Sequence, residues 1–283
     1  MIKPTRKRPR QLSLRSMQMI LNRIIGKILD FFDDLKDPDR LMPPRSLMQV
    51  FPENFKQVGQ EFKKIFIEHG GLLPDHKVLD VGCSVGRMAL PLTDYLSKDG
   101  EYWGFDVNNE SILWCQNHIT PRFENFHFIH SDVVNNKYNK IGSVNSQDYK
   151  FPFTDNYFDL IFLVSVFTHM LPPGVENYLS EISRVLKPGG ICMITLFLLN
   201  DKPERMGYPR MGYLDFKIDH GDYFSINSVT PEDSVAYKED YFLTLTHKFE
   251  LKTEKVIRHN SRSIRKDYET SQDLLFLTKV SSS

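Results

Sequence analysis

The residues best suited to hold a ligand form a short turn with two glycines, Asp80-x-Gly82-x-x-x-Gly86. The turn follows the apolar run Lys77–Val81, which is typical of a buried parallel strand. Because glycine has no side chain, the polar edge of a ligand can approach the backbone at Gly82. Helical spacing resumes over Arg87–Leu96, and the free amides that open such a helix favour a negatively charged group. Strand, turn and helix together predict a nucleotide-binding crossover.

A carboxylate in matching register follows this crossover. A second apolar strand, Glu101–Val107, carries Asp106 at 20 residues beyond Gly86. At that separation a carboxylate reaches a ribose, because its two oxygens accept from two vicinal hydroxyls. The turn is neither a dinucleotide fingerprint nor a P-loop: Ser84 and Arg87 stand where the fingerprint needs glycines, and no Gly-Lys-Ser/Thr follows.

The elements that must position these residues alternate between strand and helix. A third strand ends at Asp132, a fourth precedes a segment that contains His169, and two strands close the chain. Residues 135–149 and 200–230 show no clean period. The predicted helices are 55–69, 110–119, 178–186 and 231 to about 248, and the predicted strands after the second are 126–131, 160–165, 191–199, 249–257 and 274–280.

Three segments in this order resemble the class I methyltransferases that use S-adenosylmethionine. Residues 80–86 resemble the first motif, D/E-x-G-x-G-x-G, with Ser84 in place of the middle glycine. Residues 151–159, FPFTDNYFD, resemble the approach to the fourth strand, and residues 181–190, EISRVLKPGG, resemble the helix and turn after it. Over roughly residues 55–280 the chain is identified as a member of this family. The late Gln-Asp pair at 272–273 and FTHML at 167–171 resemble a bacterial subgroup that methylates small molecules.

The resemblance implies an α/β, Rossmann-like, doubly wound sheet of seven strands in the order 3-2-1-4-5-7-6, with strand 7 antiparallel. It implies S-adenosylmethionine as the cofactor, no metal, and a contact from Asp132 to the adenine amino group. Arg87 and Arg45 are candidates to bind the carboxylate of S-adenosylmethionine, the methyl donor. The predicted cofactor-binding residues are Asp80, Gly82, Cys83, Ser84, Gly86, Arg87, Asp106, Val107, Asp132, Val133 and Ser165.

The reaction implied is direct displacement at the sulfonium methyl group, for which the protein supplies alignment and desolvation. A base is needed if the acceptor is a hydroxyl or a protonated amine. His169 is the candidate base, because it follows the fourth strand at the edge where open α/β sheets bind ligands. The alternative is a histidine that orients the start of the next helix. Residues 200–230 are a candidate substrate lid or a polar surface loop, with Tyr213, Asp215, His220 and Tyr223 as candidate substrate contacts.

The composition limits the classes of partner. Lys+Arg and Asp+Glu number 36 each, so the net charge of the whole chain attracts neither nucleic acid nor membranes. Three cysteines without a C-x-x-C predict a reducing compartment and no structural zinc. No apolar run approaches the roughly 20 residues that span a bilayer. These features predict a cytoplasmic enzyme and leave its oligomeric state open.

The first 45 residues are predicted to be a basic helical extension of a methyltransferase domain at 46–283. All charged residues before Asp30 are basic, and apolar residues recur at helical spacing from Leu12 until Pro38 and Pro43-Pro44. The extension could contact a membrane surface through residues 1–29, bind a partner or cap the active site. The preferred interpretation is a helix docked on the domain with a basic tail.

The predicted function is methyl transfer from S-adenosylmethionine to a small-molecule acceptor, with a saccharide or natural-product hydroxyl or amine preferred. One alternative is a membrane-associated lipid methyltransferase that uses residues 1–29 as its anchor. The other is a non-catalytic interaction protein that retains the fold. The intact set of Asp80, Gly82, Gly86, Asp106 and Asp132 argues against that second alternative.

Overall fold

The structure is a computed structural model that describes residues 14–37, 39–48, 52–136, 138–200, 204–208, 212–258 and 272–280. The chain divides into two compact units, Met1–Pro52 and Glu53–Ser283. The division into an extension and a domain at residue 45 stays a prediction.

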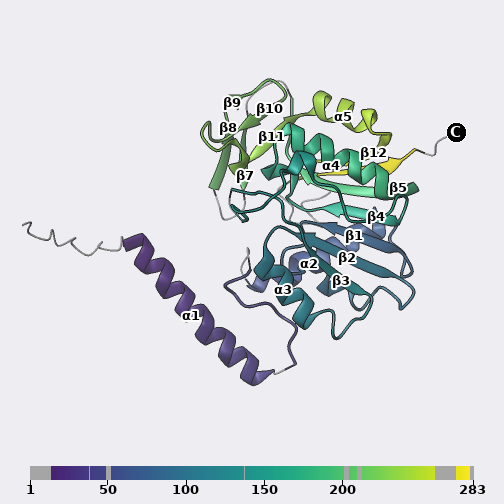
Figure 1. Cartoon of the computed structure of the whole chain (residues 1–283). Coiled ribbons are helices and arrows are strands. Elements are labelled where there is room, and N and C mark those ends of the chain that lie inside the picture. The colour runs from purple at the N-terminus through teal and green to yellow at the C-terminus, as the bar shows by residue number, and fades with distance from the viewer. Residues whose placement is uncertain are drawn as a thin grey trace, which may run out of the picture. The chain divides into compact units, whose positions relative to one another are not determined.

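The larger unit is built on a seven-stranded sheet in the order β12-β13-β5-β4-β1-β2-β3 (Figure 1). The strands from β3 to β5 pair in parallel, and β13 is antiparallel to both of its neighbours. The predicted order 3-2-1-4-5-7-6, with an antiparallel seventh strand, is therefore confirmed. The strands are β1 (Lys77–Val81), β2 (Glu101–Asp106), β3 (Phe126–His130), β4 (Phe158–Leu163), β5 (Leu186–Leu196), β12 (Leu251–Ile257) and β13 (Asp273–Lys279).

Helices connect these strands. The short 3-10 helices are η1 (Leu90–Leu92), η2 (Ser146–Asp148), η3 (Phe167–His169) and η4 (Pro231–Asp233). The α-helices of this unit are α2 (Pro52–Glu68), α3 (Asn109–His118), α4 (Pro172–Val185) and α5 (Glu239–Lys248).

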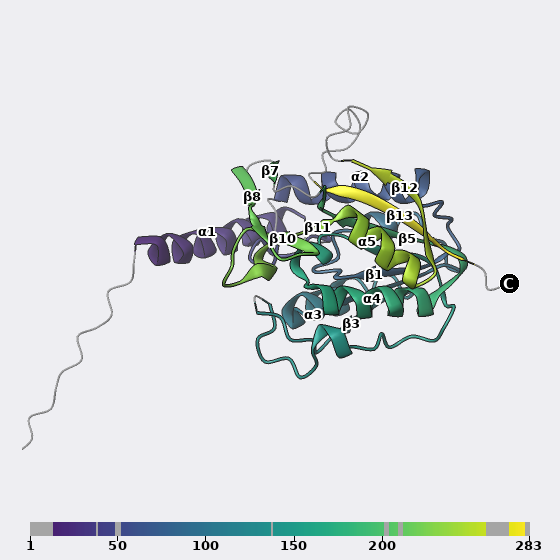
Figure 2. The same ribbon diagram turned by 90° about the horizontal axis from the view of Figure 1, so that it is seen from above.

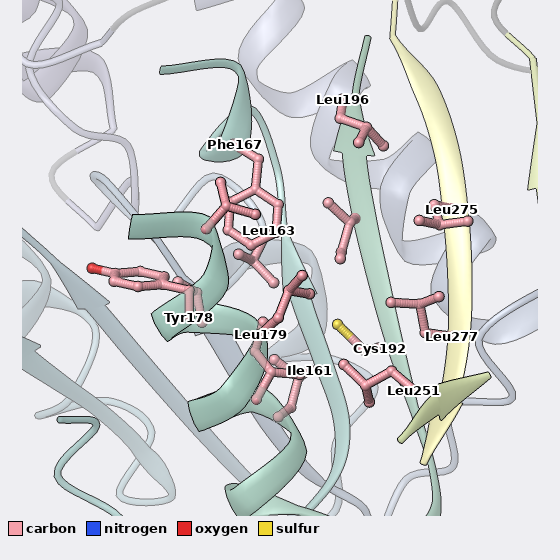
Figure 3. Close-up of a cluster of buried hydrophobic side chains, with 14 of the residues drawn as sticks. Ile161, Leu163, Phe167, Tyr178, Leu179, Cys192, Leu196, Leu251, Leu275 and Leu277 are labelled. Carbon is pink, nitrogen blue, oxygen red and sulfur yellow. The ribbon is translucent and has the colours of Figure 1, made fainter. Parts of the chain in front are cut away.

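Alternation along β4 decides which helix covers which face of the sheet. Phe66 of α2 stacks on Phe162, with ring centroids 4.2 Å apart. The neighbours of Phe162 along the strand, Ile161 and Leu163, point to the other face. There they join a core cluster with Leu179 of α4 (Figure 3). Helices α2 and α4 therefore lie on opposite sides of the sheet (Figure 2), which is the doubly wound arrangement.

The two sequence motifs that flank β4 stabilise each other. Arg184 of α4 donates to the carbonyl oxygens of Phe153 and Phe151, at 2.7 and 2.9 Å. Glu181, one turn earlier, accepts from the Phe151 amide at 2.7 Å and from Arg184 at 2.6 Å. This clamp fixes the segment before β4 against α4. The most specific local match in the sequence therefore marks a structural contact.

The predicted helix at Arg87–Leu96 is wrong. The structure has turns there and the single 3-10 helix η1. Pro91 is the physical reason, because it has no N–H and its ring disfavours a helical turn before it. The helix dipole that was expected to favour a negatively charged ligand is therefore missing after Gly86.

The predicted single helix from Pro231 to about Lys248 is also wrong. The segment contains η4, the strand β11 (Val235–Lys238) and then α5. Val235 and Tyr237 belong to the main core cluster, while Ala236 between them belongs to a second one. Such alternation, buried on both faces, is a strand pattern. Strand β11 lies in a small sheet of order β6-β11-β10-β9, with β6 (Leu198–Leu199), β9 (Ile218–Asp219) and β10 (Tyr223–Ser225).

Residues 200–230 contain strands. Besides β9 and β10, strands β7 (Glu204–Tyr208) and β8 (Gly212–Phe216) pair antiparallel as a separate ribbon. Phe216, the last residue of β8, is fully buried beside Phe197, with ring centroids 5.2 Å apart. One end of the ribbon is therefore attached to the residues that follow β5.

The smaller unit contains helix α1 (Leu14–Lys36) and the segment that follows it. The helix ends before the prolines, as the sequence predicts. Arg45 donates to Asp30 at 2.6 Å and to Asp33 at 2.7 Å. Arg40 donates to Asp34 at 2.6 Å. These ion pairs hold residues 39–48 against one face of α1.

Candidate active site

The glycine turn after β1 is tied directly to the end of β2. The amides of Gly82 and Cys83 both donate to the Phe105 carbonyl, at 2.8 and 3.1 Å. Gly82 has φ +82° and Gly86 has φ +73°, values that favour glycine. A Cβ atom on Gly82 would lie 2.6 Å from a methyl group of Val166, just beyond β4. The sequence motif thus provides both the backbone conformation and the close approach of two loops.

Asp106 joins the turn to the start of α3. Its carboxylate accepts from the amides of Ser84 and Asn108, each at 2.8 Å. Ser84 has φ +48°, an uncommon conformation that this hydrogen bond helps to hold. Burial raises the pKa of Asp106, although its bonds to backbone amides oppose the shift. Asp106, the residue predicted to bind the ribose, therefore also holds the glycine turn in place.

Asp106→Ala is expected to weaken donor binding by about 1–3 kcal/mol, because the ribose hydroxyls and two amides lose their acceptor. Asp159→Ala is the matched control. That carboxylate also accepts from a backbone amide, Lys77 N at 2.8 Å, but at the opposite end of the sheet. Titration calorimetry should find weaker donor binding only for the Asp106 variant, while both variants melt at lower temperature. Equal donor affinity in a folded Asp106 variant would contradict the proposed ribose contact.

Asp80 lies beneath the turn. Its side chain is 1% exposed, and it accepts a hydrogen bond of 2.5 Å from the Tyr102 hydroxyl of β2. Burial raises the pKa of Asp80 to about 7, against the lowering effect of that hydrogen bond. A contact with a donor molecule would therefore be indirect, through the loop that Asp80 supports.

The raised pKa of Asp80 sets a pH dependence of stability. Between about pH 4 and about pH 7 the folded state keeps a proton that the unfolded state releases, so stability falls as pH rises through this window. Asp80→Asn should remove that fall, a gain on the order of 2–4 kcal/mol at neutral pH. Denaturant unfolding at several pH values measures it. Tyr102→Phe, the control, should lose stability and keep the fall, which extends to higher pH because the pKa of Asp80 loses a lowering contact. Parallel curves for wild type and Asp80→Asn would contradict the assignment.

The predicted adenine end lies after β3. Asp132 is exposed and accepts from the Ser143 hydroxyl at 2.5 Å, which lowers its pKa. Val133 is buried and forms an isolated bridge with Val144. His130 Nε2 donates to the Val107 carbonyl, at 3.2 Å. The ends of β2 and β3 are thus held side by side. Asp106, predicted to bind the ribose, ends β2, and Asp132, predicted to bind the adenine, follows β3.

Three further residues, Cys83, Arg87 and Arg45, were predicted to contact the donor. Cys83 is buried, and its sulfur and that of Cys115 both lie 3.7 Å from the Ser84 carbonyl oxygen. These thiols form the underside of the loop. Arg87, partly exposed, follows the turn. Arg45, the other candidate for the donor's carboxylate, is paired with Asp30 and Asp33 inside the smaller unit.

His169 ends η3, just beyond β4. Its Nδ1 lies 3.1 Å from the backbone carbonyl oxygen of Glu232 in η4. A carbonyl only accepts, so Nδ1 carries the hydrogen, and in the neutral ring Nε2 then holds the lone pair. The preceding residue, Thr168, has a buried hydroxyl oxygen without a hydrogen-bond partner in the described part of the structure. The geometry fixes His169 in the tautomer whose Nε2 can accept a proton.

A polar network lies at the same end of the sheet. Gln272 Oε1 accepts from the hydroxyl groups of Ser165 (3.1 Å) and Thr195 (2.5 Å). Ser165, a predicted cofactor ligand with φ +61°, also donates its amide to Thr195 at 2.8 Å. Asp273 accepts from the Leu198 amide at 2.9 Å. The late Gln-Asp pair therefore joins the ends of β4, β5 and β13.

The predicted substrate residues are only partly brought together. Tyr223 stacks on His220, with ring centroids 4.5 Å apart. It also neighbours Tyr237, whose hydroxyl donates to the Met170 carbonyl at 2.6 Å, next to His169. Asp215 is exposed beside Lys217. Tyr213 lies in β8, and its side chain is outside the described part of the structure.

The region from β1 to β5 matches a known family. Residues 79–194 fit the model of a methyltransferase domain family, and this span includes Gly82, Asp106, Asp132 and His169. The sheet order above is that expected for the same fold. Residues 79–194 of this chain therefore form a domain of the methyltransferase family.

Two curated methyltransferases are similar in sequence. One, 29% identical over 54% of this chain and 35% of its own length, is the sterol 24-C-methyltransferase erg6 of Schizosaccharomyces pombe. The other, 30% identical over 52% of this chain and 54% of its own length, is the ubiquinone/menaquinone biosynthesis C-methyltransferase UbiE of Cupriavidus taiwanensis. The chain thus spans about a third of the length of the first relative and about half of the second.

A solved structure extends the likeness in fold to nearly the whole chain. It is a Burkholderia thailandensis 1,6-didemethyltoxoflavin-N1-methyltransferase with bound 1,6-didemethyltoxoflavin and S-adenosylhomocysteine. The TM-score is 0.50 with 13% identity, over 96% of this chain and 94% of that one. At this identity the likeness concerns the fold alone. These three proteins are named for different acceptors, so the match to a methyltransferase domain leaves the acceptor open.

Several residues of the candidate site were not predicted as site residues. Tyr102 holds Asp80, Val166 packs on Gly82, and the Glu232 carbonyl orients His169. For Gln272 a signal existed, because the late Gln-Asp pair was already part of the resemblance. For Tyr102, Val166 and Glu232 the sequence offered no such signal, since their roles depend on contacts between distant parts of the chain.

Proposed function

We propose that this protein transfers the methyl group of S-adenosylmethionine to a hydroxyl or amine of a small-molecule acceptor, with a saccharide or natural product preferred. The observation that carries the proposal is the hydrogen bond from His169 Nδ1 to the Glu232 carbonyl, at 3.1 Å. It supports a histidine prepared to accept a proton, which O- and N-methylation of protonated acceptors requires. In this reaction His169 Nε2 would accept the proton of the acceptor group, and S-adenosylmethionine, when bound, would supply the methyl group.

The residues at the carboxyl ends of β1, β2 and β3 fit the donor. The carboxylates of Asp106 and Asp132 offer acceptors for ribose hydroxyls and an adenine amino group, respectively. The small residues at 82, 84 and 86 keep side chains away from the turn between them. When bound, the donor supplies an activated methyl group with a neutral leaving group, so the protein's task is alignment and exclusion of water.

A two-stage experiment tests the proposal. Titration calorimetry first measures donor binding, and a protein that binds no donor would support the alternative of a non-catalytic interaction protein. The protein is then incubated with isotopically labelled donor and a metabolite extract, and labelled products are identified by mass spectrometry. A label on oxygen or nitrogen supports the proposal, whereas a label only on carbon contradicts it.

A second candidate function is methylation of a membrane lipid. It is favoured by α1, whose apolar side chains include Ile24 and Ile28, each about half exposed. The same labelling experiment with a lipid extract in place of the polar metabolites distinguishes the two acceptors. The cytoplasmic location predicted from the sequence is compatible with either of them.

A further inference from the structure

The exposed apolar side chains of helix α1 form a stripe along one side of the helix. Ile24, Ile28 and Leu35 recur at intervals of four and seven residues and therefore lie on one face of the helix. Exposure of these large side chains is unusual for residues of this type. Six members of the stripe have exposed fractions between 45% and 62%: Leu21, Ile24, Ile25, Ile28, Phe32 and Leu35.

The other side of α1 is occupied by ion pairs within the same unit. Asp30 and Asp33 both bind Arg45, and Arg40 lies 3.7 Å from Asp30 and 3.3 Å from Asp33. About 100° separates successive residues, so Asp30 points away from the stripe that contains Ile28. The acids are therefore neutralised on the face opposite the apolar stripe.

The remaining charge near the stripe is positive. Every charged residue before Asp30 is a lysine or an arginine, eight in all. Lys27 and Lys36, which are exposed, directly adjoin the stripe residues Ile28 and Leu35. An apolar stripe bordered by cations is the pattern of helices that lie in the interface of an anionic bilayer.

We propose that α1 binds the surface of membranes that contain anionic lipids, with its axis in the plane of the bilayer. None of the helices that the structure describes is long and apolar enough to cross a membrane, and an interfacial helix does not need to be. A second copy of the chain would bring a second set of eight cations to the stripe, and a nucleic acid would leave the apolar side chains uncovered. An anionic bilayer would cover the apolar side chains and attract the cations beside them. This inference goes beyond the proposed function and does not rest on it.

Co-sedimentation of the full chain with vesicles tests this inference. Vesicles of phosphatidylcholine alone are compared with vesicles that contain phosphatidylserine at about a third of the lipid. We expect the bound fraction to be at least tenfold higher on the anionic vesicles and to fall as salt is raised. Ile24→Glu/Ile28→Glu should reduce binding at least tenfold. The matched control is Leu73→Glu/Val280→Glu, which changes two side chains of similar exposure, 52% and 48%, outside α1.

The outcomes separate the possible occupants of the stripe. Loss of binding in the α1 variant, with binding kept in the control, supports the membrane surface. Equal binding to neutral and anionic vesicles would overturn the role of the charge. Absence of vesicle binding together with a dimer that the α1 variant dissociates would assign the stripe to a second copy. Absence of both would mean that the stripe packs on the rest of the chain. Methyl transfer to a soluble acceptor can succeed or fail in any of these cases.

Discussion

His169→Ala is expected to lower the rate of methyl transfer by roughly 10²–10⁴-fold, because the reaction would lose its general base. Donor affinity should stay nearly unchanged, since His169 follows β4 while the predicted donor ligands follow β1, β2 and β3. Single-turnover kinetics with the labelled donor measures the chemical step, and calorimetry measures donor binding. The rising limb of the pH–rate profile should disappear together with the rate.

His169→Asn separates a base from a structural histidine. The asparagine amide can still donate to the Glu232 carbonyl, so the contact between η3 and η4 can persist. If His169 acts as the base, the asparagine variant is as slow as the alanine variant while its melting temperature recovers. If His169 only orients the helix that follows, the asparagine variant regains its rate. Full turnover with an unaltered pH profile in the alanine variant would end the assignment.

Gly82→Ala is expected to abolish measurable donor binding. The new methyl group would lie 2.6 Å from Val166, and the residue would have to keep a φ near +82° or move the loop. The strain of the φ value alone costs about 1–3 kcal/mol. Calorimetry on the folded variant measures donor affinity, and thermal melting reports the loss of stability.

Two further variants divide this effect into its parts. Gly189→Ala is the matched control, because Gly189 has φ +77° but an added Cβ would meet nothing within 4 Å. It should lower the melting temperature without changing donor affinity. Val166→Ala combined with Gly82→Ala removes the atom that clashes, so donor affinity should partly return. Undiminished donor binding by Gly82→Ala would show that the turn does not approach the donor.

Asp80 and Gly82 belong to one sequence motif but have different structural roles. Gly82 shapes the upper side of the turn, where loops from two strands meet. Asp80, two residues earlier, is buried and supports the turn through Tyr102. Resemblance to a family motif marks both residues equally. Only their burial shows that one supports the loop and the other forms its surface.

Much of the fold could be predicted from the sequence, because local patterns set it. The segment Lys77–Val81 is strand β1 with the predicted bounds, since a short segment rich in Val and Leu fits a sheet buried on both faces. Gly82 and Gly86 do adopt the positive φ values that explain why glycine stands there. Several such segments together carried the resemblance to a family, and that resemblance implied the strand order.

The tertiary structure alone decided the features that depend on distant partners. Val235–Lys238 is a strand because its alternate side chains enter two different cores, whereas the local pattern favoured a helix. His169 receives its orientation from a carbonyl 63 residues away, and Ser165 meets Gln272 across 107 residues. Periodicity reports which face of a segment is apolar, but the partner of a polar atom is fixed only when the strands are brought together. The chemistry of this protein was therefore indicated by its sequence, and the geometry that would perform it came from the fold.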